Sequence, residues 1–325
     1  MLFEGRSYAL ESGESVLDGL LRHGQSVSSL CRSGACQSCL LKATAGAPPA
    51  AAQVGLKEAW KKQGFFLACM CRPQGELSVE RCDVAATHSA KVTRVAPLAP
   101  NVIGVWLSRP ADFEFRAGQF VQLSRPSDAL MRPYSIASLP SQNELELHVA
   151  LLPNGQMSGW LRDAVGQSVH VRGPFGECFY QEDELDRPLV LAGTGTGLSP
   201  LVGVLRAAAE QGHHGEISLF HGSLQASGIY LRPELAALAE ALPGLRLFGS
   251  VLSGSEHELG AQGRWHVEQA PLDQVVLSRY PKLDAHRLFL CGQPTLVQSL
   301  RKRAYLAGAS LARIHCDAFA APHSV

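Results

Sequence analysis

The sequence of 325 residues predicts a multidomain chain with an α+β part, an all-β part and an α/β part, in that order. Three observations predict this. Six of the nine cysteines lie within the first 82 residues, short alternating strands follow up to residue 185, and strands then alternate with helices to the end. Hydrophobic residues make up 46% and charged residues 18% of the chain, which is a globular composition rather than a disordered one.

The charge balance and the apolar runs exclude some classes of protein. Lys and Arg number 29 and Asp and Glu number 29, so the net charge is zero, which argues against a nucleic-acid binder. The least charged long stretch, residues 189–205, is interrupted by glycines and indicates buried strand and loop rather than a membrane span. The first residues lack the pattern of a signal peptide, so a cytoplasmic location is expected.

The cysteine spacing in the first part is typical of a metal cluster. Cys31, Cys36 and Cys39 form C-x4-C-x2-C, and Cys69 follows after 29 residues, which is the plant-type 2Fe–2S spacing. A structural zinc site usually shows paired C-x2-C knuckles, and only one is present. The spacing therefore favours a 2Fe–2S cluster, although Cys71 lies two residues beyond Cys69 and spacing alone does not exclude it as the fourth ligand.

Residues 1–83 resemble the plant-type ferredoxins, with a helix expected over 15–22 and a strand over 77–80. The family's Leu-x-Cys-x-x-x-Pro pattern is present as Leu67, Cys69 and Pro73, and it implies Cys69 as the fourth ligand. The resemblance also implies a β-grasp fold. The other cysteines match no ligand position and are expected to be small buried residues: Cys82, Cys178 and Cys316.

The second part is predicted as a six-stranded antiparallel barrel over 91–185, joined by a linker over 84–90. Its expected strands are 91–95, 102–107, 119–123, 134–137, 145–151 and 168–171. One strand carries Arg132, Tyr134 and Ser135, which offer a partner for a diphosphate, a ring for stacking and a hydroxyl. A short helix over 157–162 opens just after Gly155 and offers a helix N-terminus.

These motifs resemble the flavin domain of the ferredoxin–NADP reductase superfamily, in which R-x-Y-S and G-x-x-S segments hold the flavin. The resemblance implies FAD as the cofactor, and Ser135 as the residue that assists hydride arrival. It implies these flavin-binding residues: Arg132, Tyr134, Ser135, His148, Val149, Gly155, Gln156, Met157 and Ser158.

The third part, 186–325, is predicted as a five-stranded parallel doubly wound sheet, because strand and helix patterns alternate. The expected strands are 189–192, 217–221, 245–251, 288–291 and 312–316, and the expected helices are 201–210, 233–241, 267–279 and 295–307. After the first strand comes a glycine-rich turn that permits close approach of the backbone to a pyrophosphate: Gly193, Thr194, Gly195, Thr196 and Gly197.

This turn is not G-x-G-x-x-G, but it resembles the G-T-G-T-G-x-x-P signature of the same superfamily. Cys291 and Gly292 resemble its C-G-x-P motif, and the tail supplies Asp317, where relatives usually have Glu, and Phe319. The resemblance implies that Cys291 lies near the reactive carbon of the nicotinamide, that Asp317 organises the site and that Phe319 shields the flavin. A plain core role for Cys291 stays open.

The segment 253–259 contains two Glu and no Lys or Arg, whereas NADPH-specific relatives have Ser-Arg there, so NADH rather than NADPH is predicted. The whole order resembles the reductases of multicomponent oxygenases. It implies electron transfer from NADH through FAD and the cluster to an acceptor protein, an oxygenase or hydroxylase component. The alternatives are a reductase partner of a non-oxygenase enzyme, of the deoxysugar type, and a redox sensor.

Overall fold

The computed structural model describes the chain except for residues 28, 30, 31, 33, 35, 36, 57, 82–86, 128–130, 183, 255 and 320–325, and the side chains of 59, 256 and 262. The chain divides into two compact units. The first unit is built on residues 1–86, and the second unit consists of residues 87–127 and 132–319. Each unit is described by itself.

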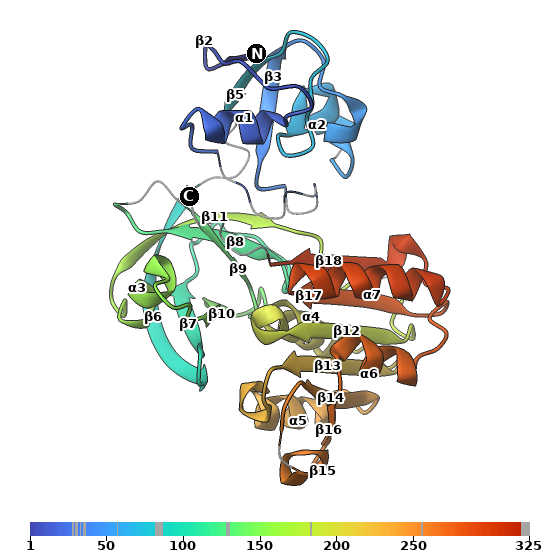
Figure 1. Cartoon of the computed structure of the whole chain (residues 1–325). Helices are drawn as coiled ribbons and strands as arrows, with labels where there is room; N and C mark the ends of the chain where they lie inside the picture. The colour runs from blue at the N-terminus through green and yellow to red at the C-terminus, as the bar shows by residue number, and fades with distance from the viewer. Residues whose placement is uncertain are drawn as a thin grey trace. The chain divides into compact units, whose positions relative to one another are not determined.

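The first unit is a five-stranded mixed sheet with two short helices (Figure 1). The strand order is β2 (Arg6–Ser7), β1 (Leu2–Phe3), β5 (Ser78–Arg81), β3 (Leu40–Ala45) and β4 (Phe65–Leu67). The helices are α1 (Val16–Arg22) and α2 (Glu58–Lys62). Strand β1 runs parallel to β5 and the other pairs are antiparallel, as expected for a β-grasp fold. The apolar face of α1 packs into the core of this unit.

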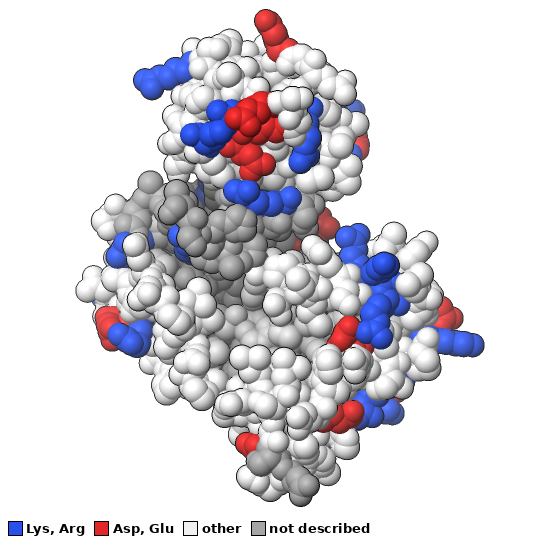
Figure 2. Space-filling model, in the orientation of Figure 1, with Lys and Arg blue, Asp and Glu red and all other residues white. Residues whose placement is uncertain are grey.

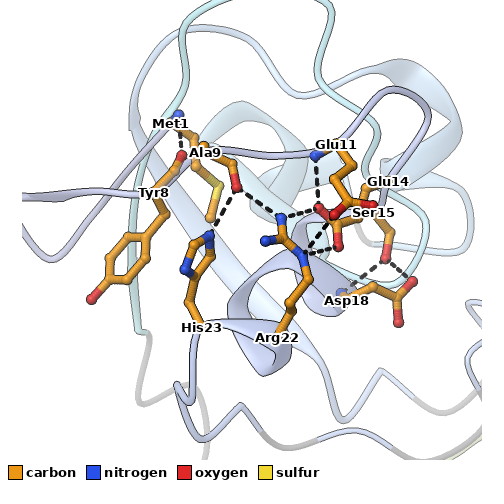
Figure 3. A network of polar contacts seen from close by, with 9 residues as sticks. All are labelled: Met1, Tyr8, Ala9, Glu11, Glu14, Ser15, Asp18, Arg22 and His23. Atoms are coloured by element: carbon orange, nitrogen blue, oxygen red, sulfur yellow. Dashed lines mark hydrogen bonds and ion pairs between the residues drawn. The ribbon is translucent and has the colours of Figure 1, made fainter.

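Polar contacts hold both ends of α1 and the segment before it (Figure 3). The Ser15 hydroxyl caps the helix by accepting a hydrogen bond of 3.1 Å from the backbone N–H of Asp18. Arg22 donates two hydrogen bonds of 2.9 and 2.8 Å to the carboxylate of Glu14 and one of 3.0 Å to the carbonyl of Ala9. These contacts tie the segment before α1 to its last turn.

The first half of the second unit is the predicted antiparallel barrel. Its six strands are β6 (Thr87–Ala99), β7 (Val102–Ser108), β8 (Phe120–Ser124), β9 (Arg132–Ser135), β10 (Glu144–Ala150) and β11 (Ser168–Phe175). They are ordered β10-β7-β6-β11-β8-β9, and a bridge between Ile136 and Leu147 closes the ring. Residues 87–90, predicted as linker, are instead the start of β6 and pair with β11, because Ala90 is buried in the barrel core.

The second half of this unit is a seven-stranded sheet with helices on its faces (Figure 1). In sheet order the strands are β15 (Gly260–Gln262), β16 (Trp265–Gln269), β14 (Leu245–Val251), β13 (Ile217–Ser223), β12 (Leu189–Thr194), β17 (Arg287–Gly292) and β18 (Ile314–Ala318). The helices are α4 (Leu198–Glu210), α5 (Arg232–Ala241), α6 (Leu272–Arg279) and α7 (Pro294–Leu306), and α3 (Gln156–Arg162) belongs to the barrel.

The sheet is larger than predicted. All five predicted strands are present and parallel, but β16 adds a sixth parallel strand and β15 an antiparallel edge. The helix predicted over 267–279 is therefore only half right. Residues 265–269 alternate between buried and less buried positions, which is the period of a strand, and Pro271 then starts α6.

Among the helices that the structure describes, none is both long and apolar enough to cross a membrane. On the face drawn in Figure 2, basic side chains lie among acidic ones on both units, in keeping with the zero net charge.

Candidate functional site

Two glycine-containing segments meet at the centre of the seven-stranded sheet. The first, Gly193–Gly197, spans the end of β12 and the turn after it. The second is the end of β17, with Cys291 and Gly292, and the two strands are neighbours with Gly193 opposite Cys291. The order of the strands along the chain reverses here, since β13 lies on one side of β12 and β17 on the other. Ligands of doubly wound sheets bind at the carboxyl ends of the strands at such a switch point.

The packing of these segments requires glycine. A Cβ at Gly197 would lie 2.6 Å from the carbonyl oxygen of Cys291, and one at Gly193 would lie 2.9 Å from the carbonyl oxygen of Gly197. Gly292 has a φ of +109°, and a Cβ there would lie 2.6 Å from the Thr194 hydroxyl. That hydroxyl accepts a hydrogen bond of 3.2 Å from the backbone N–H of Gln293. The two segments thus form one backbone-lined surface, which fits a pyrophosphate at the start of α4.

The barrel and the sheet touch at Ser135, the last residue of β9. Its hydroxyl is buried and donates a hydrogen bond of 3.1 Å to the carboxylate of Asp317 on β18. Its carbonyl accepts one of 2.9 Å from the hydroxyl of Ser199 in the first turn of α4. The two predicted residues Ser135 and Asp317 are therefore brought together, and the Asp317 side chain is long enough to make the contact.

Cys291 lies fully buried at the end of β17. Its Sγ is 3.3 Å from the Sγ of Cys178, which follows the barrel strand β11. Burial, together with the thiol of Cys178, raises the pKa of Cys291 well above its usual value, so the thiol is protonated at neutral pH. Burial likewise raises the pKa of Cys316 to about 12. These are neutral thiols, suited to packing against a ring rather than to nucleophilic attack.

Arg132 and Tyr134 share one side of β9, since residues two apart in a strand point the same way. Tyr134 is partly buried against the barrel core, and this burial raises the pKa of its phenol. A guanidinium next to a flat phenol is a donor set that fits a diphosphate and an aromatic ring system. FAD contains both.

The turn before α3 is held by hydrogen bonds of Ser158. The hydroxyl of Ser158 donates to the carbonyl of Gly155 and accepts from the N–H of Leu152, each at 3.3 Å. A Cβ at Gly155 would lie 2.4 Å from that hydroxyl. Ser158 thus shapes the turn, while Gln156 is exposed and Met157 is buried in the barrel core.

His148 and Val149 lie on opposite faces of β10. Val149 belongs to the barrel core. His148 faces away from that core and lies between Glu146 and Tyr230. Only His148 therefore reaches the boundary between barrel and sheet.

Two more predicted residues lie at the glycine segments. Thr196 lies in the single turn Gly195–Gly197 and is partly exposed. Phe319 follows β18 directly, and its backbone N–H donates a hydrogen bond of 2.7 Å to the carbonyl of Gly292. The end of the described chain is thereby fixed to the second glycine segment.

The cysteine site of the first unit is described in part. Cys31 and Cys36 lie outside the described residues, as does Cys82. Cys39 and Cys69 are buried, and the backbone N–H of Cys69 points to the Sγ of Cys39 at 3.5 Å. Hydrogen bonds from backbone N–H groups to cysteine sulfur are typical of 2Fe–2S ligands, so these residues fit a cluster.

Cys71 differs from Cys69. It is fully buried in the core of the first unit, and this burial raises the pKa of its thiol to about 12. The ligand loop itself turns through left-handed positions at Arg32, Gly34 and Gln37. Gly34 approaches Met70 so closely that a Cβ would lie 3.0 Å from its Cγ.

A buried histidine next to the first glycine segment predicts acid sensitivity. The Nε2 of His221 is 3.1 Å from the carbonyl oxygen of Gly195, and burial lowers the pKa of His221 to about 4. The unfolded chain, with a pKa near 6.5, therefore takes up this proton first as the pH falls. His221 removes about 2 kcal/mol from the free energy of unfolding between pH 7 and pH 5.

The measurement is the thermal midpoint of wild type and His221→Gln at these two pH values. We expect the midpoint to fall less in the variant than in wild type. His214→Gln, at an exposed position, serves as the control and should behave like wild type. An equal fall in His221→Gln and wild type would contradict the assignment.

Three side chains of this region are not among the predicted site residues. Ser199, Cys178 and Tyr230 contact predicted site residues across large separations in the chain. The sole hint was the position of Ser199 within the glycine-rich signature.

Family models match all three parts of the chain. A 2Fe-2S iron-sulfur cluster binding domain matches residues 3–74, an oxidoreductase FAD-binding domain residues 91–180, and an oxidoreductase NAD-binding domain residues 191–302. Fold, glycine segments and family models together define an NAD(P)H-dependent oxidoreductase with FAD and a 2Fe–2S cluster.

Known proteins resemble the chain over its whole length. The reductase subunit of an aromatic O-demethylase from an Amycolatopsis species is 33% identical over 97% of this chain and 96% of its own. The reductase component of the naphthalene 1,2-dioxygenase system of Pseudomonas putida is 29% identical over 97% and 96%. The crystal structure of the Amycolatopsis cytochrome P450 reductase GcoB is 29% identical, with a TM-score of 0.69 over 98% and 97%. The chain belongs to the family of ferredoxin–NAD(P) reductases in which a 2Fe–2S domain precedes the FAD-binding and NAD-binding domains.

Proposed function

We propose that this chain is the reductase component of an oxygenase system, taking electrons from NADH and delivering them to an oxygenase or hydroxylase. When bound, FAD accepts a two-electron hydride and the 2Fe–2S cluster carries single electrons at about −400 mV. The chain thus converts a two-electron donor into a one-electron supply. The relatives that are 33% and 29% identical over nearly the full length support this proposal.

The contact between Ser135 and Asp317 is the observation that carries the proposal for the reacting site. It lies where the barrel meets the switch point, so a flavin on β9 and a nicotinamide above β12 would meet there. Ser135 offers its hydroxyl to the reacting edge of the flavin, and Asp317 orients that hydroxyl. Cys291, at the end of β17, is proposed to lie near the nicotinamide as a neutral, apolar group.

The remaining predicted residues surround this point. Arg132 and Tyr134 are proposed to hold the diphosphate and the ring of FAD, with the turn at Gly155 and its neighbours Gln156, Met157 and Ser158 closing the flavin site. The segment Gly193–Gly197, with Gly292, is proposed to hold the pyrophosphate of NADH, and Phe319 to cover the flavin. Val149 contributes through the barrel core alone.

The cluster is proposed to bind Cys31, Cys36, Cys39 and Cys69. The contact of the Cys69 backbone with the Cys39 sulfur favours Cys69 over Cys71 as the fourth ligand. Electrons leave through the loop around Gly34, because a one-electron centre must lie near the surface to reach a partner.

The proposed domain limits assign one cofactor to each domain. We propose a ferredoxin-like domain over 1–83, an FAD-binding barrel up to residue 185 and an NAD-binding domain over 186–325. We also propose a cytoplasmic location, since thiolate ligands and a pyridine nucleotide donor suit a reducing compartment.

The acceptor is proposed to be an oxygenase of aromatic substrates, as in the relatives. The test combines the purified chain and NADH with two oxygenases, a haem O-demethylase and an aromatic-ring dioxygenase, and measures product against NADH consumed. Coupled turnover with either one supports the proposal. Slow NADH oxidation with every acceptor, artificial acceptors included, would instead indicate a redox sensor. Activity only with a non-oxygenase enzyme would indicate the reductase partner of such an enzyme, of the deoxysugar type.

NADH is predicted as the donor from the segment after β14. The carboxylate of Glu258 folds back over this segment, since a Cβ built on Gly254 would lie 3.7 Å from its Oε2. A carboxylate there would repel the negative charge of a 2′-phosphate, and salt screens this repulsion in part. We expect kcat/KM for NADH to exceed that for NADPH by about tenfold or more. A ratio of one or below would contradict the prediction.

A further inference from the structure

A chain of buried polar side chains crosses from the barrel to the NAD-binding half of the second unit. It contains Arg206 on α4, Glu146 and His148 on β10, Tyr230 before α5, and His221 on β13. All except Arg206 are at least nine-tenths buried. None of these five residues is Ser135 or Asp317, and the proposed function gives their contacts no role.

The contacts fix where each proton lies. Arg206 Nη1 is 2.5 Å from Glu146 Oε2, and Glu146 Oε1 is 3.2 Å from His148 Nε2. Burial tends to raise the pKa of Glu146, but the hydrogen bond from His148 and the charge of Arg206 prevail and lower it to about 2. Glu146 is therefore ionised and accepts from His148.

His148 is neutral, because burial lowers its pKa despite the neighbouring carboxylate. Its one proton lies on Nε2, so Nδ1 accepts a hydrogen bond of 3.1 Å from the hydroxyl of Tyr230. Burial raises the pKa of Tyr230 well above its usual value, which keeps that hydroxyl protonated.

Tyr230 also reaches the first glycine segment. Its ring meets His148 edge to face at a centroid distance of 5.4 Å and meets His221 in the same way at 5.2 Å. His221 Nε2 lies 3.1 Å from the carbonyl oxygen of Gly195, which can only accept, so the imidazole donates. Gly195 begins the turn that carries Thr196 and has a φ of +54°.

A buried ion pair adds little net stability, and its best attested use is to fix register. We propose that Tyr230 is a positioning residue for hydride transfer: by bonding to His148 on β10 of the barrel and packing on His221, it sets the Gly195–Gly197 turn relative to the FAD-binding barrel. This deepens the proposed function and rests on it. A misplacement of 1 Å between reacting groups can lower a rate by about 100-fold.

The test is Tyr230→Phe, which keeps the ring and removes the hydroxyl that donates a hydrogen bond to His148. Tyr180→Phe is the matched control, because Tyr180 is a buried tyrosine whose hydroxyl is 2.9 Å from Nδ1 of the buried His213, with rings edge to face at 5.7 Å. The measurement is anaerobic stopped-flow reduction of the FAD-loaded chain by NADH and by NADH deuterated at the transferred position.

We expect Tyr230→Phe to lower the limiting rate of flavin reduction by about tenfold. Its deuterium isotope effect should change, while the Kd for NADH stays within about threefold. Tyr180→Phe should match wild type in all three. A Tyr230→Phe variant with wild-type rate and isotope effect would overturn the proposal, as would an equal loss in Tyr180→Phe.

A second pair of variants covers a failure of Tyr230→Phe to fold. His148→Gln keeps an acceptor for Tyr230 and a donor for Glu146, whereas His148→Leu removes both. The proposal requires His148→Gln to reduce flavin several-fold faster than His148→Leu, and equal rates would overturn it. Failure of the NADH-to-flavin step on which this proposal rests has a separate signature, since wild type itself would then show no flavin reduction by NADH, and the positioning role would fall with it. A failure of the proposed oxygenase partner would leave flavin reduction in wild type intact.

Discussion

A Cys69→Ala variant is expected to be isolated with FAD but without the cluster. The two irons of a 2Fe–2S cluster need four thiolate ligands. Loss of an outer-shell partner typically lowers metal affinity by about 10- to 100-fold, and loss of a ligand itself lowers it further. Cytochrome c reduction by NADH should fall by roughly 100-fold, because a one-electron acceptor takes its electrons from the cluster. Ferricyanide reduction, which flavin supports directly, should persist near the wild-type rate. Cys36→Ser should behave in the same way.

Cys71→Ala is the matched control for this prediction. Cys71 is a fully buried cysteine of the same segment whose thiol has a pKa of about 12. We expect this variant to keep about two iron atoms per chain and cytochrome c reduction, with a modest loss of thermal stability from the small cavity. Iron retained in Cys69→Ala but lost in Cys71→Ala would show that the fourth ligand is Cys71 instead.

The second large effect is expected at Ser135. Its buried hydroxyl donates to Asp317 at 3.1 Å and is held in place by that carboxylate, so Ser135→Ala removes a preoriented polar group from the reacting site and leaves the carboxylate with one bond fewer. Loss of one preoriented polar group from a buried site typically lowers kcat by about 100- to 1,000-fold. We expect a loss of this size in NADH-dependent ferricyanide reduction, with KM for NADH changed far less.

The control is Ser218→Ala. Ser218 is a fully buried serine on β13 whose hydroxyl is 2.7 Å from that of Tyr280. It should keep the wild-type rate, and the FAD content of both variants should equal that of wild type. A Ser135→Ala enzyme with kcat within about threefold of wild type would rule out a role for this hydroxyl in the chemical step.

The sequence predicts best those parts of this protein whose defining residues lie close together along the chain. The spacing of Cys31, Cys36 and Cys39 reflects one loop around a cluster, and the glycines of 193–197 reflect one turn between a strand and a helix. The barrel strands were predicted for the same reason, since alternation of apolar residues is visible over five or six residues.

Contacts between distant segments were not visible in this way. Ser135 and Asp317 are 182 residues apart, and only the family resemblance placed them in one site. The bond between His148 and Tyr230 spans 82 residues and depends on how barrel and sheet pack, for which neither residue carries a local signal. Strand β16 was missed because its apolar residues also fit the periodicity of the helix that follows.

An anaerobic reductive titration tests the central claim most directly, because it counts the electrons that one chain accepts. The chain, loaded with FAD, iron and sulfide, is titrated with dithionite while the absorbance of flavin and cluster is followed. Two electrons for FAD and one for the cluster predict an end point of about three electrons per chain, and about two for Cys69→Ala. An end point of two in the wild-type chain, with no bleaching assignable to a cluster, would contradict the account.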